Sequence, residues 1–482
     1  MAYIMEKYAC FGGASTNFAG SRESLARQGA IGHRGRMSVS LFGHVVRFGF
    51  DRVGVVVDPL LIRMLRRHHF PAARLLAAAE ASYGDADLFR SGLPPAQARR
   101  FDRLLGRKAY QAARDACVAS EAATEAWRDI MVSGVAGDPA QAEMERRRAA
   151  TRRLATATAL LTALGRRDLP LVQWGMQPPA EHWPPGAADF SAPDDFMTVD
   201  AGPVYREGVL YRQWLYAPAE TGLLGDRAWA RASWPAEGPV IGACVVGSGV
   251  GVEWDIYVRP RSDYDFSATF AGHGIAAIEL VSPGHGLRRA VGRYGGESFF
   301  EGAPVSVGAL LAAQVRESAR WIAWARRRFE RPVGIFGVSM SSFAAQLALT
   351  HAISWPATAR PEAGFLLAHS GDLPGVVSGP LARALGIPAA FEAHGWDDAA
   401  LAPWRSALGP GRAAAVPGAR ILSVIGRHDA VTPYRDGLAI AELWGLPPEN
   451  CFRWPHGHFG LPMRLGLDDR PFARFAKVLA GA

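Results

Sequence analysis

Short apolar runs separated by helix-like segments are the feature that most constrains how this chain can fold. Six such runs follow one another after residue 196: Pro239–Val246, Gly274–Val281, Pro332–Val338, Gly364–His369, Ala419–Ile425 and Cys451–Trp454. Strands buried on both faces read as continuous apolar runs, and parallel strands need crossover segments between them. The pattern therefore predicts an α/β domain in which helices cover both faces of a mostly parallel sheet.

The rest of the 482-residue chain divides by composition. Residues 1–177 carry apolar residues at helical spacings and predict a mainly helical N-terminal region. Residues 178–195 contain five prolines, which predicts a linker without regular structure. Residues 196–482 form the expected α/β domain, and Tyr205–Tyr216 predicts a hairpin near its start.

One interval between two of the expected strands is longer than the others. Residues 371–418 contain Trp396 and Trp404 among many Gly, Pro and Ala residues. Long ordered insertions in compact domains are usually functional, so we expect a cap over the mouth of a site rather than a surface excursion. In that arrangement the two tryptophans would contact substrate.

Charge and composition narrow the classes of partner. The net charge is +8, but 53 Lys and Arg are nearly matched by 45 Asp and Glu. The densest basic run, residues 144–153, lies on a helix expected between Asp138 and Gly165, and we interpret it as a solvent-facing surface. No zinc-ligand spacing and no nucleic-acid module is recognisable, so we expect neither a bound metal nor a nucleic-acid partner.

Two further patterns bear on location. Four scattered cysteines suit a reducing compartment, and the N-terminus lacks a signal-peptide pattern, so a cytoplasmic location is expected. Residues 332–359 contain no Asp, Glu, Lys or Arg, a length that could span a membrane. Because Gly334, Gly337 and several serines interrupt this stretch, we expect a buried strand followed by a buried helix and no transmembrane segment.

The stretch Gly337-Val338-Ser339-Met340-Ser341 nearly matches the G-x-S-x-G nucleophile elbow. A serine nucleophile needs an imidazole base, and that base needs an acid to orient it. Asp429 follows the strand ending at Ile425, and His458 follows the strand ending at Trp454. The order Ser, Asp, His at the carboxyl ends of parallel strands predicts that the three side chains meet at one edge of the sheet.

Alternatives exist for two of these positions. His456 lies nearer the last strand than His458, and Asp372 follows an earlier strand than Asp429. His369 and His428 are interpreted as structural or supporting groups. Ser339 could also occupy an ordinary buried turn, without a catalytic role.

The developing oxyanion of such a site needs backbone N–H donors. One candidate is the N–H of Met340, directly after the nucleophile. The other comes from the loop Gly247-Ser248-Gly249-Val250-Gly251, at either Ser248 or Gly249. This loop lacks the spacing of a phosphate-binding loop, and its glycines suit close approach of the backbone to a carbonyl oxygen.

Residues 196–482 resemble the α/β-hydrolase superfamily, and more narrowly the group of abhydrolase domain-containing protein eighteen and its bacterial relatives. The resemblance is carried by the Gly247–Gly249 loop, Pro283–Arg288, Gly337–Met340, Asp429-Ala430 with Pro433, and Gly457-His458. It implies Ser339 as nucleophile, Asp429 as acid and His458 as base. Ser341 departs from the family pattern, which has glycine there, and we expect it to be tolerated as a small residue.

These features together predict a serine hydrolase that cleaves a carboxylic ester of a small or lipid-like molecule, with no cofactor. An acyltransferase with the same triad, or a non-catalytic binding protein with the same fold, are the alternatives. Arg288 and Arg289 would contact an anionic group of the substrate or form structural pairs with Glu297 and the surface. For the N-terminal region, a second lid, a surface for homo-oligomerisation and a docking element stay open.

Overall fold

The structure is a computed structural model that describes residues 58–179, 189–221, 225, 227–254 and 266–481. Residues 1–57 of the expected N-terminal region and residues 180–188 of the expected linker lie outside the described residues. Every described residue belongs to one compact unit, Gly54–Ala482. This grouping does not test the expected boundaries at residues 177 and 195, which stay a prediction.

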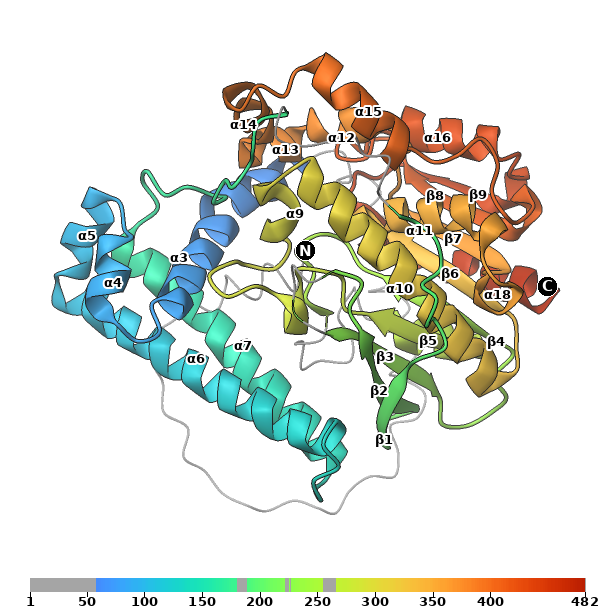
Figure 1. Ribbon diagram of the computed structural model, residues 1–482, viewed down its shortest axis with the longest axis horizontal. Helices are drawn as coiled ribbons and strands as arrows, with labels where there is room; N and C mark the ends of the chain where they lie inside the picture. Colours follow the sequence, from blue (N-terminus) through green and yellow to red (C-terminus); the bar gives the residue numbers. More distant parts are fainter. Residues whose placement is uncertain (1–57, 180–188, 222–224, 226, 255–265, 482) are drawn as a thin grey trace, which may run out of the picture. The chain divides into compact units, whose positions relative to one another are not determined.

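The described part of the N-terminal region is helical, as its spacing predicts (Figure 1). Its elements are η1 (Leu65–His69), α3 (Phe70–Ala81), α4 (Ala86–Ser91), α5 (Pro95–Phe101), α6 (Leu104–Met131) and α7 (Pro139–Leu164). Asp138 caps α7, because its carboxylate accepts from the N–H groups of Ala140 at 2.9 Å and Gln141 at 3.3 Å. The helix ends at Gly165, whose φ of 76° breaks the helical path.

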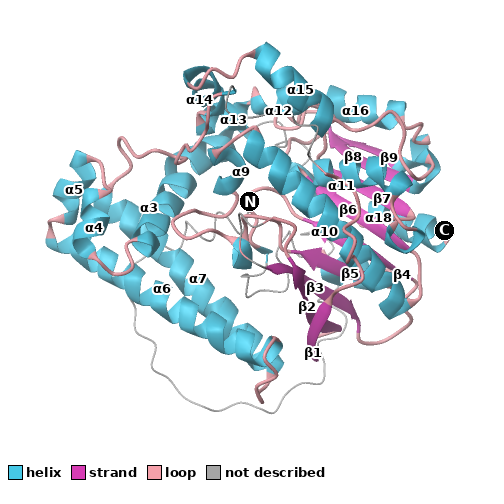
Figure 2. Ribbon diagram, in the orientation of Figure 1, coloured by secondary structure: helices cyan, strands magenta, loops and turns pink. Residues whose placement is uncertain are grey.

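A nine-stranded sheet forms the centre of the domain (Figure 2). Its strands lie in the order β1-β2-β3-β5-β4-β6-β7-β8-β9. The pairs β1–β2, β2–β3 and β3–β5 are antiparallel, and the remaining pairs are parallel. The strands are β1 (Asp200–Glu207), β2 (Leu210–Pro218), β3 (Arg227–Pro235), β4 (Gly242–Gly247), β5 (Ile275–Leu280), β6 (Val333–Val338), β7 (Ala363–Leu367), β8 (Ile421–Gly426) and β9 (Cys451–Trp454).

This topology confirms the expected fold class, an α/β arrangement in which a mostly parallel sheet is flanked by helices. The six apolar runs are strands β4 to β9, and the expected hairpin is β1–β2, in which Glu207 pairs with Leu210. The uncharged stretch 332–359 is β6 followed by α11 (Met340–His351). Among the helices that the structure describes, none is both long and apolar enough to cross a membrane.

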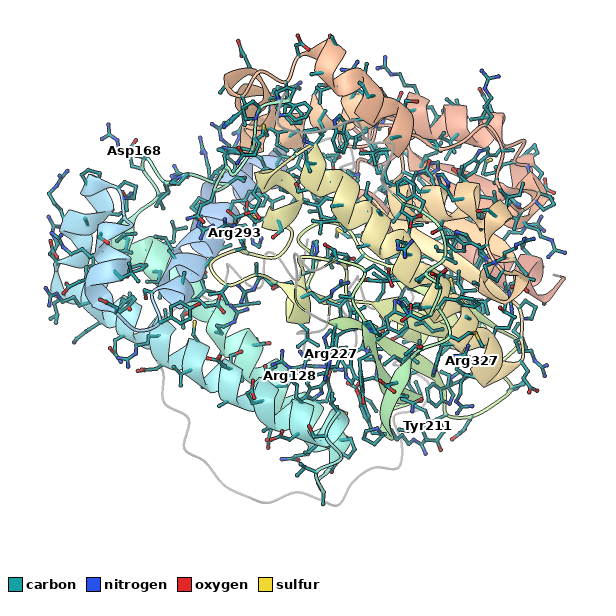
Figure 3. All side chains as sticks on the ribbon, viewed as in Figure 1. Arg128, Asp168, Tyr211, Arg227, Arg293 and Arg327 are labelled. Atoms are coloured by element: carbon teal, nitrogen blue, oxygen red, sulfur yellow. The ribbon has the colours of Figure 1, made fainter. Side chains whose placement is uncertain are left out.

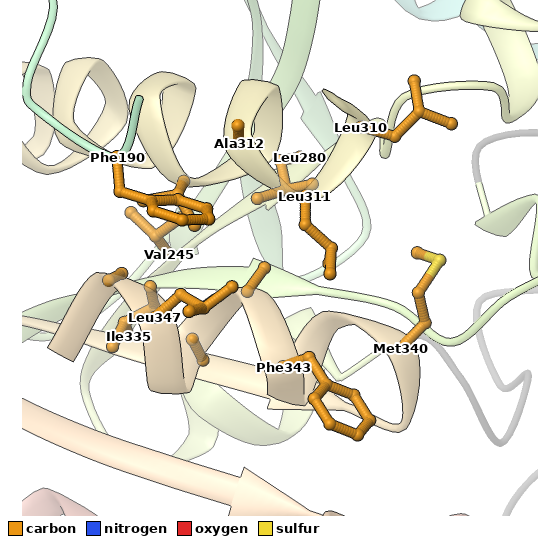
Figure 4. Close-up of a cluster of buried hydrophobic side chains, with 14 of the residues drawn as sticks. Phe190, Val245, Leu280, Leu310, Leu311, Ala312, Ile335, Met340, Phe343 and Leu347 are labelled. Atoms are coloured by element: carbon orange, nitrogen blue, oxygen red, sulfur yellow. The ribbon is translucent and has the colours of Figure 1, made fainter. Parts of the chain in front are cut away.

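Helices cover both faces of the sheet, which explains why β4 to β8 are buried along their whole length. On one face, Val245 and Ile335 belong to a cluster with side chains of α10 (Val305–Phe329) and α11, drawn in Figure 4. On the other face, Val246 and Phe336 pack with α8 (Ser267–Gly272), α17 (Gly460–Leu465) and α18 (Arg470–Ala480). Neighbouring residues of one strand thus enter opposite layers of the core.

Shorter elements complete the connections. They are η5 (Gly286–Arg288), α9 (Glu297–Glu301), η6 (Ala352–Ser354), η7 (Ala357–Ala359), η8 (Gly418–Arg420), α16 (Tyr434–Leu443) and η9 (Pro448–Asn450). The long interval 371–418 is a helical insertion made of α12 (Leu373–Val377), α13 (Pro380–Leu385), α14 (Ile387–Ala393) and α15 (Asp398–Leu408).

The basic run on α7 is only partly the solvent-facing surface that its composition suggests, because Arg148 and Arg152 are exposed but two other arginines are not. Arg146 and Arg147 are buried against Glu143 of the same helix, with N–O distances of 3.1 and 2.6 Å. Arg147 also pairs with Glu207 of β1 at 2.8 Å. The Arg146 guanidinium lies over the ring of Trp127 at 4.9 Å. A charge run on a helix can therefore be its buried face when the facing strands supply carboxylates.

The buried charges continue across the antiparallel part of the sheet. Arg212 of β2 pairs with Glu207 of β1 at 2.6 Å, and Arg231 of β3 pairs with Glu279 of β5 at 2.8 Å. We call this group, Glu143, Arg146, Arg147, Glu207, Arg212, Arg231 and Glu279, the buried charge cluster; all of its members are buried except Glu207, which is half-buried. The pair of Arg147 with Glu207 connects α7 to β1, and the pairs of Arg212 and Arg231 extend the cluster across β2, β3 and β5.

Glu143 provides a test of this cluster. Burial alone would raise its pKa, but Arg146 and Arg147 lower the pKa to about 2. Replacing Glu143 by Ala leaves buried guanidinium groups without their carboxylate, so we expect the free energy of unfolding to fall by about 3–5 kcal/mol. Urea denaturation of wild type and variant measures the difference. Glu145→Ala, on the exposed side of the same helix, is the control and should change stability by less than about 0.5 kcal/mol.

Candidate active site

Ser339 occupies the sharp turn between β6 and α11. Its backbone has φ of 54° and ψ of −114°, a conformation that costs a non-glycine residue about 1–3 kcal/mol. The N–H of Ser339 donates to the carbonyl oxygen of Leu367 at 3.0 Å, which ties the turn to the end of β7. Gly337 is required, because a Cβ there would lie 2.2 Å from the carbonyl oxygen of Ser341. The sequence 337–341 thus forms an elbow that holds the serine hydroxyl above the end of the sheet.

The structure brings Ser339, His458 and Asp429 into one hydrogen-bonded chain. His458 Nε2 lies 2.9 Å from Ser339 Oγ, and His458 Nδ1 lies 2.9 Å from Asp429 Oδ2. An Nδ1–H that donates to the carboxylate leaves Nε2 free to accept the serine proton. This is the geometry that a serine nucleophile, its general base and the acid that orients the base would require.

The alternative histidine and acid lie in other surroundings. His456 is buried, and its ring packs against Gly460 at the start of α17. Asp372 caps α12, where its Oδ2 accepts from the N–H of Gly375 at 3.2 Å. The buried His369 bonds the hydroxyl of Ser423 at 2.7 Å, and burial lowers its pKa to about 4. These contacts favour a structural part for all three.

Asp429 is held rigidly by its own loop. Its Oδ1 accepts from the N–H groups of Val431 at 2.9 Å and Thr432 at 2.8 Å. The Thr432 hydroxyl donates to Asp429 Oδ2 at 2.7 Å and lies 3.1 Å from His458 Nδ1. Three donors and the imidazole therefore surround a carboxylate that is almost wholly buried.

The electrostatics of His458 suit a general base. Burial alone would lower the pKa of this imidazole, but the Asp429 carboxylate raises it, with a further contribution from Asp58. The net effect is a pKa above the ordinary value of 6.5. A raised pKa makes the imidazole a stronger proton acceptor when Ser339 attacks.

This shift predicts how the reactivity of Ser339 depends on pH. Only the neutral imidazole can accept the serine proton, so the rate of Ser339 modification by a fluorophosphonate should rise with pH. Because the pKa of His458 is raised, we expect the midpoint of that rise above pH 6.5. Asp429→Asn removes the largest stabilisation of the charged ring and should move the midpoint down. A wild-type midpoint at or below pH 6.5 would contradict this assignment.

The glycine loop after β4 lies beside the nucleophile. A Cβ on Gly249 would stand 3.5 Å from the Cβ of Ser339, so the backbone of this loop approaches the serine closely. The N–H of Gly251 donates to Nε2 of His285 at 2.9 Å, and Nδ1 of that ring lies 2.9 Å from the carbonyl oxygen of Pro283. His285 thereby fixes the loop through its neutral tautomer. Met340 begins α11, where backbone N–H groups have no acceptor within the helix.

Ser341 is more than a tolerated small residue. Its hydroxyl donates to the carbonyl oxygen of Ser248 in the glycine loop and accepts from Nε2 of Gln314 at 2.8 Å. Gln314 belongs to α10, so one hydroxyl joins the elbow, the glycine loop and the covering helix. Gly247 makes room for this contact, because its Cβ would lie 2.5 Å from that of Ser341.

Removing the Ser341 hydroxyl should therefore loosen the glycine loop. In Ser341→Ala the carbonyl of Ser248 and the amide of Gln314 both lose a partner, at a cost of about 1–3 kcal/mol. If that cost falls on the transition state, the rate of fluorophosphonate labelling drops roughly 5- to 150-fold. Ser354→Ala, on an exposed 3₁₀ turn, is the matched control and should label at the wild-type rate. A wild-type rate in Ser341→Ala would exclude this role.

The two arginines proposed for substrate binding lie in ion pairs. Arg288 is buried and forms a bidentate pair with Glu317 of α10 at 2.7 Å. Arg289 forms a bidentate pair with Glu80 of α3 at 2.6 and 2.7 Å. The contacts favour the structural alternative, although the partners are not Glu297, which binds Arg74. Arg293 of the same loop, labelled in Figure 3, pairs with Glu301.

The two tryptophans belong to the packing of the insertion. Trp396 is buried and donates from Nε1 to the carbonyl oxygen of Gln177 at 2.8 Å. Trp404 packs against Gly308 of α10, and the two indole rings meet edge to face at 6.3 Å. Trp396 also lines a cleft of about 700 Å³ between α12, α14 and α15. Their contact with substrate stays a prediction.

Sequence reasoning missed four supporting residues: Asp58, His285, Gln314 and Thr432. His285 and Thr432 stand within or next to loops that were already singled out, so a polar residue beside a catalytic loop was the available signal. Asp58 and Gln314 come from helices far away in the chain, and nothing in their local sequence marks them.

Comparisons with known proteins give structural similarities only. No protein-family model matches the chain, and no curated protein matches it. Among solved structures it is similar to a novel cold-adapted esterase from an Arctic intertidal metagenomic library, with 16% identity, a TM-score of 0.38, and coverage of 59% of this chain and 100% of that one. Acetyl xylan esterase 1 from Thermoanaerobacterium sp. JW/SL YS485 gives 15% identity, a TM-score of 0.39, and coverage of 58% of this chain and 95% of that one. An S-formylglutathione hydrolase from Agrobacterium tumefaciens gives 15% identity, a TM-score of 0.37, and coverage of 58% of this chain and 99% of that one. Similarity at this level does not assign the chain to a family.

Proposed function

We propose that this protein is a serine hydrolase that cleaves carboxylic esters. The observation that carries the proposal is the chain from Ser339 Oγ through the His458 ring to Asp429, with both contacts at 2.9 Å. It ends on a serine held in a strained turn beside a glycine-rich loop. Strained backbone at a polar, hydrogen-bonded residue is typical of functional sites.

The reaction follows from this geometry. Ser339 Oγ attacks the ester carbonyl carbon while His458 Nε2 takes the hydroxyl proton. The tetrahedral oxyanion accepts hydrogen bonds from the N–H of Met340 and from the N–H of Ser248 or Gly249. When the intermediate collapses, the imidazolium gives its proton to the leaving alcohol. Water then attacks the acyl-enzyme, with His458 again as base, and releases the acid and the free serine.

The surroundings of the triad support the assignment of roles. Asp429 cannot turn away, because Val431 and Thr432 hold both of its oxygens. The imidazole is therefore presented in one tautomer and one orientation. We propose that the insertion 371–418 caps the site and that its cleft beside Trp396 contributes to binding a small or lipid-like ester. Membership of the narrower group of abhydrolase domain-containing protein eighteen is part of the same proposal.

Labelling with a fluorophosphonate probe, together with hydrolysis of p-nitrophenyl esters of increasing chain length, tests the function. Wild type should label and hydrolyse, whereas Ser339→Ala should not label and should lose ester hydrolysis by on the order of 10⁴-fold or more. Ser354→Ala, an exposed serine outside the site, should behave as wild type.

The outcomes separate the alternatives. A folded wild type that neither labels nor hydrolyses would exclude a hydrolase and favour a binding protein. Equal labelling of Ser339→Ala would place the reactive serine elsewhere. If added alcohols or amines divert most of the acyl group from water, the protein is an acyltransferase with the same nucleophile.

A further inference from the structure

A carboxylate from the N-terminal region lies on the backbone of the loop that carries the catalytic imidazole. Asp58 stands at the beginning of the described helical segment that leads into η1 and α3. It accepts hydrogen bonds from the N–H of His458 and, at 3.1 Å, from the N–H of Phe459. The donors and the acceptor are 400 and 401 residues apart in the chain.

The loop is shaped to receive this carboxylate. A Cβ on Gly457 would lie 2.3 Å from Asp58 Oδ2, so any other residue at this position would overlap with the carboxylate. The Asp58 residue is only 3% exposed. A carboxylate taken out of water this completely is unfavourable unless it is well hydrogen-bonded or near a positive charge. Here it gains two backbone donors and the neighbouring His458.

The contact acts on the base through its main chain rather than through its ring. Nδ1 of His458 is directed to Asp429 and Thr432, and Nε2 is directed to Ser339. Asp58 restrains the position of the backbone from which the ring extends. A displacement of about 1 Å at a reacting group can cost roughly 100-fold in rate.

We propose that Asp58 is a positioning residue for the catalytic base, so that the N-terminal helical region completes the active site instead of only covering it. The inference rests on the proposed serine hydrolase function and adds a residue to that site. It also commits the N-terminal region to a role at the site, beyond the lid, oligomerisation and docking roles that its sequence leaves open.

The charge of Asp58 adds a second effect. The charged groups that act on the imidazole are Asp429 and Asp58, and both raise its pKa against the effect of burial. Burial raises the pKa of Asp58 above its ordinary value and the charge of Asp429 adds to this, whereas His458 and the N–H of Phe459 lower it. Removing the charge of Asp58 should therefore lower the pKa of His458, whereas a neutral group that only packs against the loop would leave that pKa unchanged.

The test compares Asp58→Asn with Asp85→Asn in the full-length protein. Asp85 is a matched control, because its carboxylate also accepts from two backbone N–H groups, those of Asp87 and Leu88, but at the start of α4. For Asp58→Asn we expect kcat for a p-nitrophenyl ester to fall by roughly 10- to 100-fold with little change in KM. In a plot of kcat against pH, the rise on the acidic side should move to lower pH; we call this rise the acidic limb. Asp85→Asn should keep both the wild-type kcat and the wild-type limb.

A second variant approaches the same contact from the other side. In Gly457→Ala the new Cβ displaces the Asp58 carboxylate, so this variant should show the same fall in kcat and the same shift of the limb. In the double variant Asp58→Asn/Gly457→Ala, the second change should add little to the first, since both remove one interaction. Circular dichroism shows whether each variant is folded, and Gly457→Ala decides the question if Asp58→Asn does not fold.

Failure of this inference is distinct from failure of the proposed function. If wild type does not label or hydrolyse, the hydrolase proposal fails. If wild type is active but Asp58→Asn keeps an unshifted acidic limb, the positioning role is overturned. The same holds if the effects of Asp58→Asn and Gly457→Ala simply add.

Discussion

The close crossing of β6 and α11 is the constraint on which the candidate site depends. Gly337 allows the helix backbone to approach within a distance that no side chain at this position would permit. That approach forces Ser339 into a strained conformation with positive φ and turns its hydroxyl out of the sheet. The strain is maintained because the turn is anchored on three sides, by Leu367, by the following Ser342, whose N–H donates to the carbonyl oxygen of Ser339 at 2.9 Å, and by Ser341. A relaxed turn at this position would not present the serine to His458.

The groups around the serine come from several parts of the chain, and hydrogen bonds through backbone atoms join them. His285 fixes the glycine loop, Ser341 ties that loop to the elbow, and Asp58 holds the histidine loop. Each contact restrains a loop that would otherwise move independently of the sheet. The proposed covalent catalysis would need its groups within a fraction of an ångström of their reactive positions, which these contacts help to fix.

Buried charge explains why the N-terminal helices are part of the same compact unit as the sheet. The buried charge cluster joins α7 to β1, β2, β3 and β5, and Nη1 of Arg74 in α3 lies 2.7 Å from both carboxylate oxygens of Glu297 in α9. Such pairs have a large cost if one partner is lost, so the helices are committed to one place on the domain. That fixed place brings Asp58 to the histidine loop. The same chemistry accounts for Arg288 and Arg289, whose guanidinium groups bind Glu317 and Glu80.

The sequence by itself determined the α/β class, the six strands from β4 to β9, the hairpin and the elbow, because these follow from local patterns of apolar residues, glycines and turns. It also predicted that Ser339, Asp429 and His458 would meet, since all three follow strands whose carboxyl ends share one edge of the sheet. Tertiary structure alone decided that Arg146 and Arg147 are buried, that Ser341 bonds Ser248, and that Asp58 holds the loop of His458. Ser341 and Asp58 meet partners that are remote in the chain, whereas Arg146 and Arg147 pair with Glu143 of their own helix. In all of these cases, whether a polar side chain faces water or a buried partner depends on packing that local sequence does not encode.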